Sequence, residues 1–275
     1  MSPRPEAGAA SGQPAAGRRR APTAHGARAV SRPSGYVRDR VQGPRVRRGL
    51  ERIAPVPNIL SRQPWEELIP HIARSGANVE QTLLRLKRFT QLAIEWNRSV
   101  SNLISRNDEA RIVTRHIRES VECAHELKQS GAKHWLDFGS GAGFPAIPLA
   151  ILGVGERWML VESRRPKTLF MRKALQELEI LHVEVYHGRL EALVEERGGA
   201  REYDGFTSRA TMKLAPTLKL AEALVQKDGT AFLWKGSGRR EELDEPTAWN
   251  AAWELERTLG VGDEHTAIAI FKRTS

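Results

Sequence analysis

The sequence contains little cysteine and no long apolar run. Cys123 is the single cysteine, so neither a disulfide framework nor a CxxC metal site can form, and a reducing compartment suits the chain. No stretch reaches the roughly 18 consecutive apolar residues that indicate a membrane helix, so we expect no membrane span. Because Cys123 lies in a segment with helical character, we interpret it as a helix-face residue rather than as a nucleophile.

Acidic residues and lysine are scarce near the N-terminus. Residues 1–50 contain eleven arginines, no lysine and two acids, Glu6 and Asp39, and so carry +9 of the net +10 charge. Residues 1–57 show no apolar periodicity, and such a segment cannot bury enough surface to offset its ordering entropy. We predict a disordered basic arm that adds nonspecific affinity for RNA phosphates. A start codon assigned too far upstream and an organellar transit peptide are the alternatives, although the Pro and Gly content disfavours the amphipathic helix of such peptides.

A glycine-rich stretch at residues 135–145 (WLDFGSGAGFP) dominates the rest of the chain. It is typical of a strand end, a glycine turn and a helix that begins near Pro145. A dinucleotide fingerprint would need Gly or Ala where Phe144 stands, and a bulky side chain there would block a pyrophosphate. The pattern Asp-x-Gly-x-Gly-x-Gly, from Asp137 to Gly143, instead resembles the first motif of class I S-adenosylmethionine-dependent methyltransferases. An acid beside the loop suits a ligand with sulfonium and ammonium groups, and a turn that binds no ligand is the alternative.

A second acid, Glu162, ends the next predicted strand, 23 positions after Gly139. A carboxylate at the tip of the second strand can accept hydrogen bonds from both ribose hydroxyls of a nucleoside. We therefore predict Glu162 as the ribose anchor, with a solvated strand-end carboxylate as the alternative.

The 275 residues leave room for one large α/β domain with appendages. Strands and helices alternate after residue 133, which indicates a mostly parallel sheet. The predicted strands are 133–138, 157–162, 182–186, 203–208, 230–234 and a last pair near 251–259 and 266–271, which completes seven. Residues 131–275 would form this core and residues 58–130 an N-terminal helical region.

Helical spacing predicts the structure of the segment before the core. Asn78 and Gln81 form a predicted capping pair. A stripe at helical spacing indicates packing surface; it comprises Val79, Leu83, Leu86, Phe89, Ala93 and Trp96. A charged stretch further on is interpreted as a solvated helix face without metal-ligand spacing; it contains Arg111, Arg115, His116, Arg118 and Glu119.

Ligands of open α/β sheets collect at the carboxyl ends of the strands. The residues predicted at that edge are Asp137, the glycine loop, Glu162, Leu190, Glu191, Arg209 and Lys235. With these residues and the motifs below, the chain resembles the bacterial small-subunit rRNA guanine-N7 methyltransferases (RsmG, also called GidB) over roughly residues 80–236. The motifs are Asn102-Leu103-Ile104, Arg115-His116 with Glu119-Ser120, the run GFPAIPL from Gly143 to Leu149, Gly188-Arg189-Leu190-Glu191, Ser208-Arg209-Ala210 and Lys235-Gly236. The family usually has Asp at the positions of Glu119 and Glu162, and Gly at that of Ala146.

The resemblance implies a Rossmann-like class I S-adenosylmethionine-dependent methyltransferase fold with a seven-stranded, mostly parallel sheet and an N-terminal helical extension. It implies S-adenosylmethionine as cofactor and N7 of a guanine in 16S (small-subunit) ribosomal RNA as target. The family pattern places Leu190 and Glu191 beside the adenine. The predicted cofactor-binding residues are Asp137, Gly139, Gly141, Gly143, Phe144, Glu162, Leu190, Glu191 and Arg209.

The residues at the end of the fourth predicted strand indicate which atom of the substrate is methylated. Ser208-Arg209-Ala210 stands where enzymes that methylate amino groups often carry Asn/Asp-Pro-Pro-aromatic. Guanine N7 has a free lone pair, so no proton must be removed and alignment can supply most of the acceleration. We predict Arg209 as the catalytic residue, which holds a phosphate or the edge of the acceptor base. An ion pair of Arg209 with Asp204 or Glu191 is the alternative.

The remaining expectations concern partners. The predicted RNA contacts are Arg164, Arg165, Lys167 and Lys235, with a solvated face as the alternative for the first three. We expect a cytoplasmic monomer that acts on small-subunit rRNA or the 30S subunit, with no metal and no membrane. Two other functions compete with this one: a small-molecule methyltransferase with a closed lid, and a noncatalytic adaptor that binds S-adenosylmethionine. A nucleotide oxidoreductase is the least favoured function, because Phe144 would block a pyrophosphate.

Overall fold

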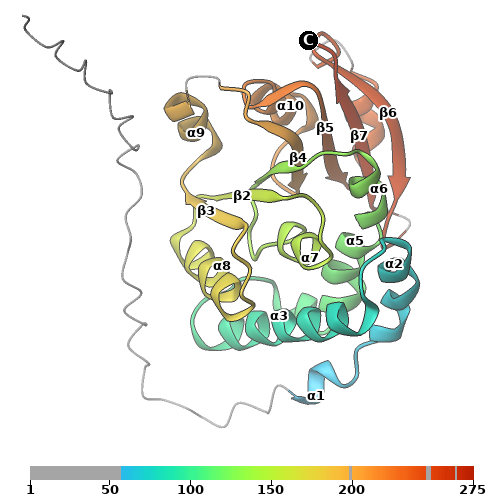
Figure 1. Cartoon of the computed structure of the whole chain (residues 1–275), viewed down its shortest axis with the longest axis vertical. Coiled ribbons are helices and arrows are strands. Elements are labelled where there is room, and N and C mark those ends of the chain that lie inside the picture. The colour runs from blue at the N-terminus through green and yellow to red at the C-terminus, as the bar shows by residue number, and fades with distance from the viewer. Residues whose placement is uncertain (1–56, 198–199, 246–248, 264) are drawn as a thin grey trace, which may run out of the picture. The chain divides into compact units, whose positions relative to one another are not determined.

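The computed structural model describes residues 57–197, 200–245, 249–263 and 265–275 (Figure 1). The chain divides into two units, Met1–Arg45 and Val46–Ser275, and every described residue belongs to the second. The predicted basic arm, 1–57, lies outside the described residues except for Pro57, so the arm stays a prediction. No helix in the described ranges is long and apolar enough to cross a membrane.

The segment before the sheet is helical, as predicted. Its elements are α1 (Pro57–Leu60), η1 (Trp65–Leu68), α2 (Ile69–Arg74), α3 (Val79–Ser99), α4 (Arg106–Glu109), the π-helical η2 (Ile112–Ile117), α5 (Arg118–Val121) and α6 (Ala124–Gln129). The backbone N–H of Gln81 donates to the Asn78 side chain at 2.9 Å, which confirms the predicted cap of α3. The predicted stripe faces inward, with Leu86, Phe89 and Ala93 fully buried.

The core contains the seven predicted strands. They are β1 (His134–Phe138), β2 (Arg157–Glu162), β3 (Val183–His187), β4 (Tyr203–Arg209), β5 (Val225–Lys235), β6 (Trp253–Gly260) and β7 (Ala267–Arg273). The intervening helices are α7 (Ala146–Ile151), α8 (Arg165–Glu177), α9 (Leu190–Arg197), α10 (Leu214–Glu222) and α11 (Arg239–Leu243). The strand order is β3-β2-β1-β4-β5-β7-β6. Strands β1 to β5 pair in parallel, and β7 is antiparallel to both of its neighbours.

Helices cover both faces of the sheet (Figure 1). One buried cluster joins α3, α7 and α8 to one face of the strands, through Trp135, Trp158 and Phe232. The other cluster joins α9 and α10 to the opposite face, through Leu136 and Phe206. This is a Rossmann-like α/β architecture, and the predicted fold class is confirmed.

The strand order reverses between β1 and β4. The chain proceeds from β1 to β2 and β3 on one side, and continues with β4 and β5 on the other. In open α/β sheets, ligands bind at the carboxyl ends of the strands at such a switch point. The loops that follow β1 and β4 meet there.

Candidate active site

Asp137 lies in β1, immediately before the glycine loop, and is fully buried. Its Oδ1 accepts a hydrogen bond from the Thr207 hydroxyl at 2.7 Å, across the β1–β4 pair. Its Oδ2 is also buried and has no hydrogen-bond partner in the described part of the chain. Burial raises the pKa of Asp137 to about 7, although the contacts with Thr207 and Ser140 oppose the rise. The site therefore contains a buried acceptor oxygen that lacks a donor.

Two glycines of the loop are required by its geometry. Gly139 has a φ of 70° and Gly143 a φ of 86°, in the left-handed region that favours glycine. A Cβ at Gly139 would collide with the methyl group of Thr211, and one at Gly143 would collide with Ile147. The loop backbone is thus packed closely against its neighbours, with no side chains of its own at these two positions.

Glu162 ends β2 and binds the glycine loop directly. Its Oε2 accepts from the Gly141 N–H at 2.9 Å, and its Oε1 accepts from the Arg164 N–H at 2.8 Å. The residue is buried, so the alternative of a solvated strand-end carboxylate is wrong. Each carboxylate oxygen can accept a further hydrogen bond, so Glu162 keeps acceptor capacity for a ligand.

The basic residues after β2, Arg164, Arg165 and Lys167, differ in exposure. Arg164 and Arg165 are exposed. Lys167 is half-buried, and its Nζ lies 3.7 Å from the position that a Cβ on Gly141 would take. Burial lowers the pKa of Lys167, and the nearby Glu162 opposes this change. The ammonium group of Lys167 thus lies at the glycine loop, and its contact with RNA stays a prediction.

Phe144 joins the loop to the helical segment. Its ring is buried, with centroids 5.2 Å from Phe89 in an edge contact and 5.1 Å from His116 in a stacked contact. Burial, followed by the nearby Arg209 charge, lowers the pKa of His116 to about 3, so the imidazole is neutral. Phe144 can meet a ligand at the loop chiefly through its backbone.

Arg209, at the end of β4, forms a buried ion pair. Its guanidinium lies 2.8 Å from Glu119 Oε2, and the two side chains are 12% and 4% exposed. The predicted alternative partners are wrong: Asp204 accepts from the backbone N–H groups of Lys133 and His134 instead, and Glu191 is exposed. The interpretation of the charged stretch as a solvated face is also wrong for Glu119.

Glu119 is fixed by residues distant in the sequence. Its carbonyl accepts from the Trp234 indole N–H at 3.3 Å, and a Cβ on Gly262, between β6 and β7, would collide with its side chain. Burial raises the pKa of Glu119, and the charge of Arg209 opposes the rise. The helical segment, the end of β5 and the β6–β7 turn thus converge on the carboxylate that holds Arg209.

The two residues expected beside an adenine differ in exposure. Leu190 begins α9 and is completely buried in the second core cluster, and Glu191 is exposed. The Glu191 side chain is accessible to a ligand, whereas Leu190 is not.

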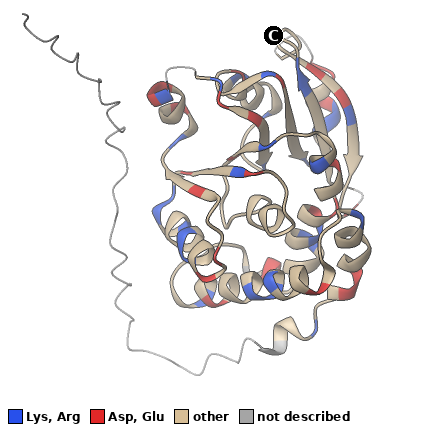
Figure 2. Cartoon of the chain, in the orientation of Figure 1, with Lys and Arg blue, Asp and Glu red and all other residues tan. Residues whose placement is uncertain are grey.

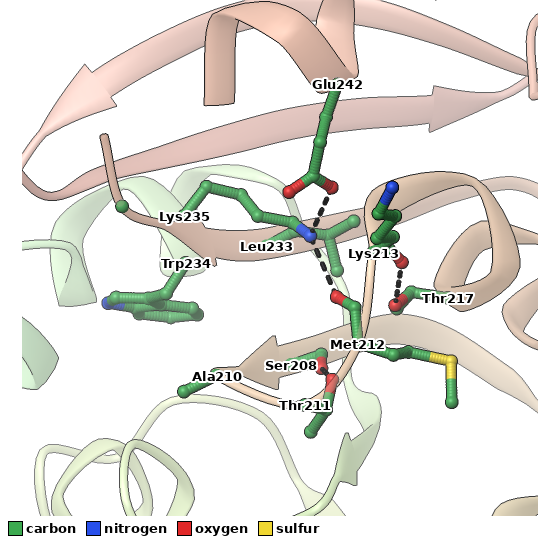
Figure 3. A pocket seen from close by; sticks show the side chains of 11 residues that line it. Ser208, Ala210, Thr211, Met212, Lys213, Thr217, Leu233, Trp234, Lys235 and Glu242 are labelled. Atoms are coloured by element: carbon green, nitrogen blue, oxygen red, sulfur yellow. Dashed lines mark hydrogen bonds and ion pairs between the residues drawn. The ribbon is translucent and has the colours of Figure 1, made fainter. Parts of the chain in front are cut away.

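A pocket of about 240 Å³ lies at the carboxyl ends of β4 and β5 (Figure 3). Thr211, one of its lining residues, also packs against Gly139, so the pocket adjoins the glycine loop. The Lys235 ammonium donates to the Met212 carbonyl at 3.0 Å and to Glu242 Oε2 at 2.8 Å. Lys235 is only 10% exposed and is paired with Glu242, and its contact with RNA phosphates stays a prediction.

Four residues of this site were not predicted: Glu119, Thr207, Thr211 and Glu242. Thr207 and Thr211 flank the Ser208-Arg209-Ala210 motif, and that proximity is the signal that could have identified them. Glu119 was noted only as a family position and as part of a solvated helix face, and Glu242 lies beyond the stretch that carries the resemblance. The described residues contain no group of three side chains that could hold a metal ion.

Comparisons with known proteins agree with this geometry. The sequence model of the GidB family, described as rRNA small subunit methyltransferase G, matches residues 82–259. The ribosomal RNA small subunit methyltransferase G of Desulfitobacterium hafniense is 31% identical over 219 residues, covering 76% of this chain and 90% of that protein. The protein of the same name from Stutzerimonas stutzeri is 32% identical, covering 79% of this chain and 100% of that protein.

Solved structures of similar fold include the methyltransferase yhhF of Escherichia coli, with a TM-score of 0.46, 17% identity and coverage of 58% of this chain and 86% of that one. The ribosomal protein L11 methylase of Lactobacillus delbrueckii gives a TM-score of 0.47 at 12% identity, with 57% and 79% coverage. The family model spans more than half of the chain, and both relatives are covered almost completely. The chain therefore belongs to the rRNA small subunit methyltransferase G family and is a methyltransferase.

Proposed function

We propose that the protein transfers a methyl group from S-adenosylmethionine to N7 of a guanine in small-subunit ribosomal RNA. One observation carries the proposal: in a chain of this family, the glycine loop, Asp137 and Glu162 lie beside Arg209 at the switch point of the sheet. Ribosomal subunits as substrate imply action in the cytoplasm. We propose that the protein acts as a monomer and takes either free rRNA or the 30S subunit.

The residues of the loop fit this cofactor. The unpartnered Asp137 Oδ2 suits a cationic ammonium donor, and the remaining acceptor capacity of Glu162 suits ribose hydroxyls. The Lys167 ammonium beside Gly141 suits a carboxylate. Leu190, and Glu191 through its side chain, would flank the adenine. The bound cofactor would supply an electrophilic methyl group.

Arg209 would orient the acceptor. Guanine N7 attacks with its own lone pair, so the protein needs to align the base rather than remove a proton. The transfer leaves a positive charge on the base, and a lone cation beside it would oppose this change. The Glu119 carboxylate, 2.8 Å from the Arg209 guanidinium, offsets that charge. His116 is neutral near pH 7 and adds no positive charge.

We propose a separate role for each of the three segments of the chain. We propose that residues 131–275 form the catalytic core, residues 58–130 form a helical region that supplies Glu119, and residues 1–57 form the RNA-binding arm. Arg164 and Arg165 are exposed at the start of α8 and are the basic residues proposed to contact RNA phosphates.

Methyl transfer to stripped small subunits and to naked rRNA, followed by nucleoside mass spectrometry, tests the proposal. We expect 7-methylguanosine as the product. At saturating cofactor, the single-turnover rate should be nearly flat from about pH 6 to 8.5, because guanine stays neutral and Arg209 stays charged. N2-methylguanosine or a methylated adenine would contradict the assignment, and a steep rise of the rate with pH would reveal a catalytic base.

A further inference from the structure

The pocket at the ends of β4 and β5 has two chemically different ends. At one end, Thr211 packs its methyl group against Gly139 of the glycine loop, and Ser208 pairs with the Thr211 hydroxyl at 2.6 Å. At the other end are Lys235 of β5 and Glu242 of α11 (Figure 3). A molecule in the pocket would therefore have one end toward the cofactor loop and the other toward a Lys–Glu pair.

The Lys–Glu pair presents one donor and one acceptor to the pocket. Glu242 Oε2 accepts from both Lys235 Nζ and the Leu214 N–H, and Oε1 has no hydrogen-bond partner within the described ranges. An ammonium group has three N–H donors, and the contacts of Lys235 with Met212 and Glu242 use two of them. One N–H of Lys235 and one oxygen of Glu242 remain, side by side, for a ligand.

Apolar surface completes the pocket. Figure 3 shows the Trp234 ring on one side and the Met212 side chain on another, with Leu233 behind the Lys235 ammonium. Met212 is 37% exposed, so its side chain is accessible to an entering group. Enzymes that modify a nucleobase take it out of the stack into such a pocket and read its Watson–Crick edge by hydrogen bonds.

We propose that this pocket receives the acceptor guanine and that Lys235 and Glu242 read its Watson–Crick edge. The inference rests on the proposed function and names the residues that select the base. Guanine O6 would accept from Lys235, and the N1–H and N2–H groups would donate to the Glu242 carboxylate. N7 adjoins O6 on the Hoogsteen edge, outside the edge that Lys235 and Glu242 would read, so its lone pair stays free for methyl transfer.

The pair excludes the other purine by polarity. Adenine presents a donor at N6 and an acceptor at N1, which is the reverse of what Lys235 and Glu242 require. A site built to hydrogen-bond one edge rejects a base that leaves its polar groups unpaired, because those groups then lose their partners. The same pair also fixes the loop after β4 through the Met212 carbonyl and the Leu214 N–H.

The test compares guanine with inosine, which lacks the N2 amino group. The methylated nucleotide is first mapped with the wild-type protein, and small subunits are then reconstituted with guanosine or inosine at that position. Glu242→Gln keeps an oxygen that can accept from Lys235 and Leu214 but removes the carboxylate. Glu241→Gln, a change at the exposed neighbouring position on α11, is the matched control.

On guanosine subunits, Glu242→Gln should lower kcat/KM about ten- to hundredfold, as expected when hydrogen bonds to a charged group are removed, whereas Glu241→Gln should not. On inosine subunits, the wild type should lose activity, and Glu242→Gln should cost clearly less than on guanosine subunits, because the N2–H bond is already missing and only the N1–H bond to Glu242 is left to lose. The cofactor dissociation constant of the variant, measured by calorimetry, should be unchanged.

Equal losses on guanosine and inosine subunits would show that Glu242 acts only through the loop and would overturn the inference, as would weaker cofactor binding. Full activity of Glu242→Gln on guanosine subunits would also overturn it. Failure of the proposed function is distinguishable, because the wild-type protein would then form no 7-methylguanosine during the mapping step.

Discussion

Burial determines what each charged residue at the sheet edge can do. Arg209 and Glu119 are both removed from water, and a buried ion pair gains little net stability because desolvation offsets the attraction. Removal of one partner is costly, since the other charge then stays buried and alone. A fall in activity on mutation of Arg209 would therefore mix a catalytic effect with a stability effect.

A double substitution separates the two effects. We expect Arg209→Ala to lower the free energy of unfolding by about 3–5 kcal/mol, because Glu119 is left unpaired. Arg209→Met combined with Glu119→Leu should recover most of that stability by apolar packing, yet methyl transfer should stay low. Urea unfolding and single-turnover assays measure the two quantities. If the restored fold also regained its activity, Arg209 would not be a catalytic residue.

Asp137 should make stability depend on pH. Its pKa in the folded protein is about 7, above the ordinary 3.8, so the folded state favours the protonated carboxyl. Its contribution to stability is complete below about pH 4 and is lost as the pH rises to about 7. Over that range, the wild type should lose up to about 4 kcal/mol relative to Asp137→Asn. Urea unfolding from pH 4 to 8 checks this, and parallel curves for the two proteins would contradict it.

Glu162 should control cofactor affinity. Glu162→Ala removes the predicted ribose contacts and also the acceptor of the Gly141 N–H. At about 1.5–3 kcal/mol for hydrogen bonds to a charged group, the dissociation constant for S-adenosylmethionine should rise about ten- to hundredfold. Glu195→Ala, at an exposed position of α9, is the control. Calorimetry that gave the same affinity for both variants would place the ribose elsewhere.

Sequence motifs predict correctly which residues lie at the strand ends. Asp137, Glu162 and Arg209 lie at or near the carboxyl ends of parallel strands, and the ends of such strands meet at one edge by topology alone. Lys235 follows the same rule, but its pairing with Glu242 could not be predicted, because α11 reaches it only in the folded chain. A lysine at a strand end has the same sequence pattern whether it is solvated or paired.

At the level of elements, regular periodicity made the prediction reliable. The strands and α3 have long, clear patterns, and the structure contains all of them. The segment after α3 was harder, because η2 (Ile112–Ile117) is π-helical and changes the angular spacing of the residues that follow. Glu119 consequently turns inward although the pattern of an ordinary helix places it on a charged outer face.

Two leucines of α3 offer a matched test of how this helix packs against the core. Leu86 is fully buried and Leu84 is 62% exposed, two positions apart on the same helix. Leu86→Ala should lower the free energy of unfolding by about 2–5 kcal/mol through the cavity that it leaves. Leu84→Ala should change it by no more than about 0.5 kcal/mol. Chemical denaturation of both variants measures the difference, and similar values would mean that α3 packs by another face.

Across the whole molecule, the positive charge is uneven. Residues 1–50 carry +9 and the other 225 residues only +1. Basic and acidic residues are interspersed along α3 (Figure 2). A polyanionic substrate should therefore be attracted mainly by the N-terminal arm, which is a prediction from composition and lies outside the described residues.

Deletion of residues 1–55 tests that prediction. Both buried clusters of the part of the chain that the structure describes are formed by residues from Ile59 onward, so we expect folding and cofactor binding to persist. RNA affinity should fall, and the slope of log K against log salt should flatten by about 0.7–0.9 for each phosphate that the arm no longer neutralises, because fewer counterions are released. A full-length variant with all eleven arginines of residues 1–50 changed to glutamine should behave like the deletion if charge is the cause. Binding titrations with rRNA at several salt concentrations measure both proteins, and an unchanged slope would mean that the arm does not contact RNA.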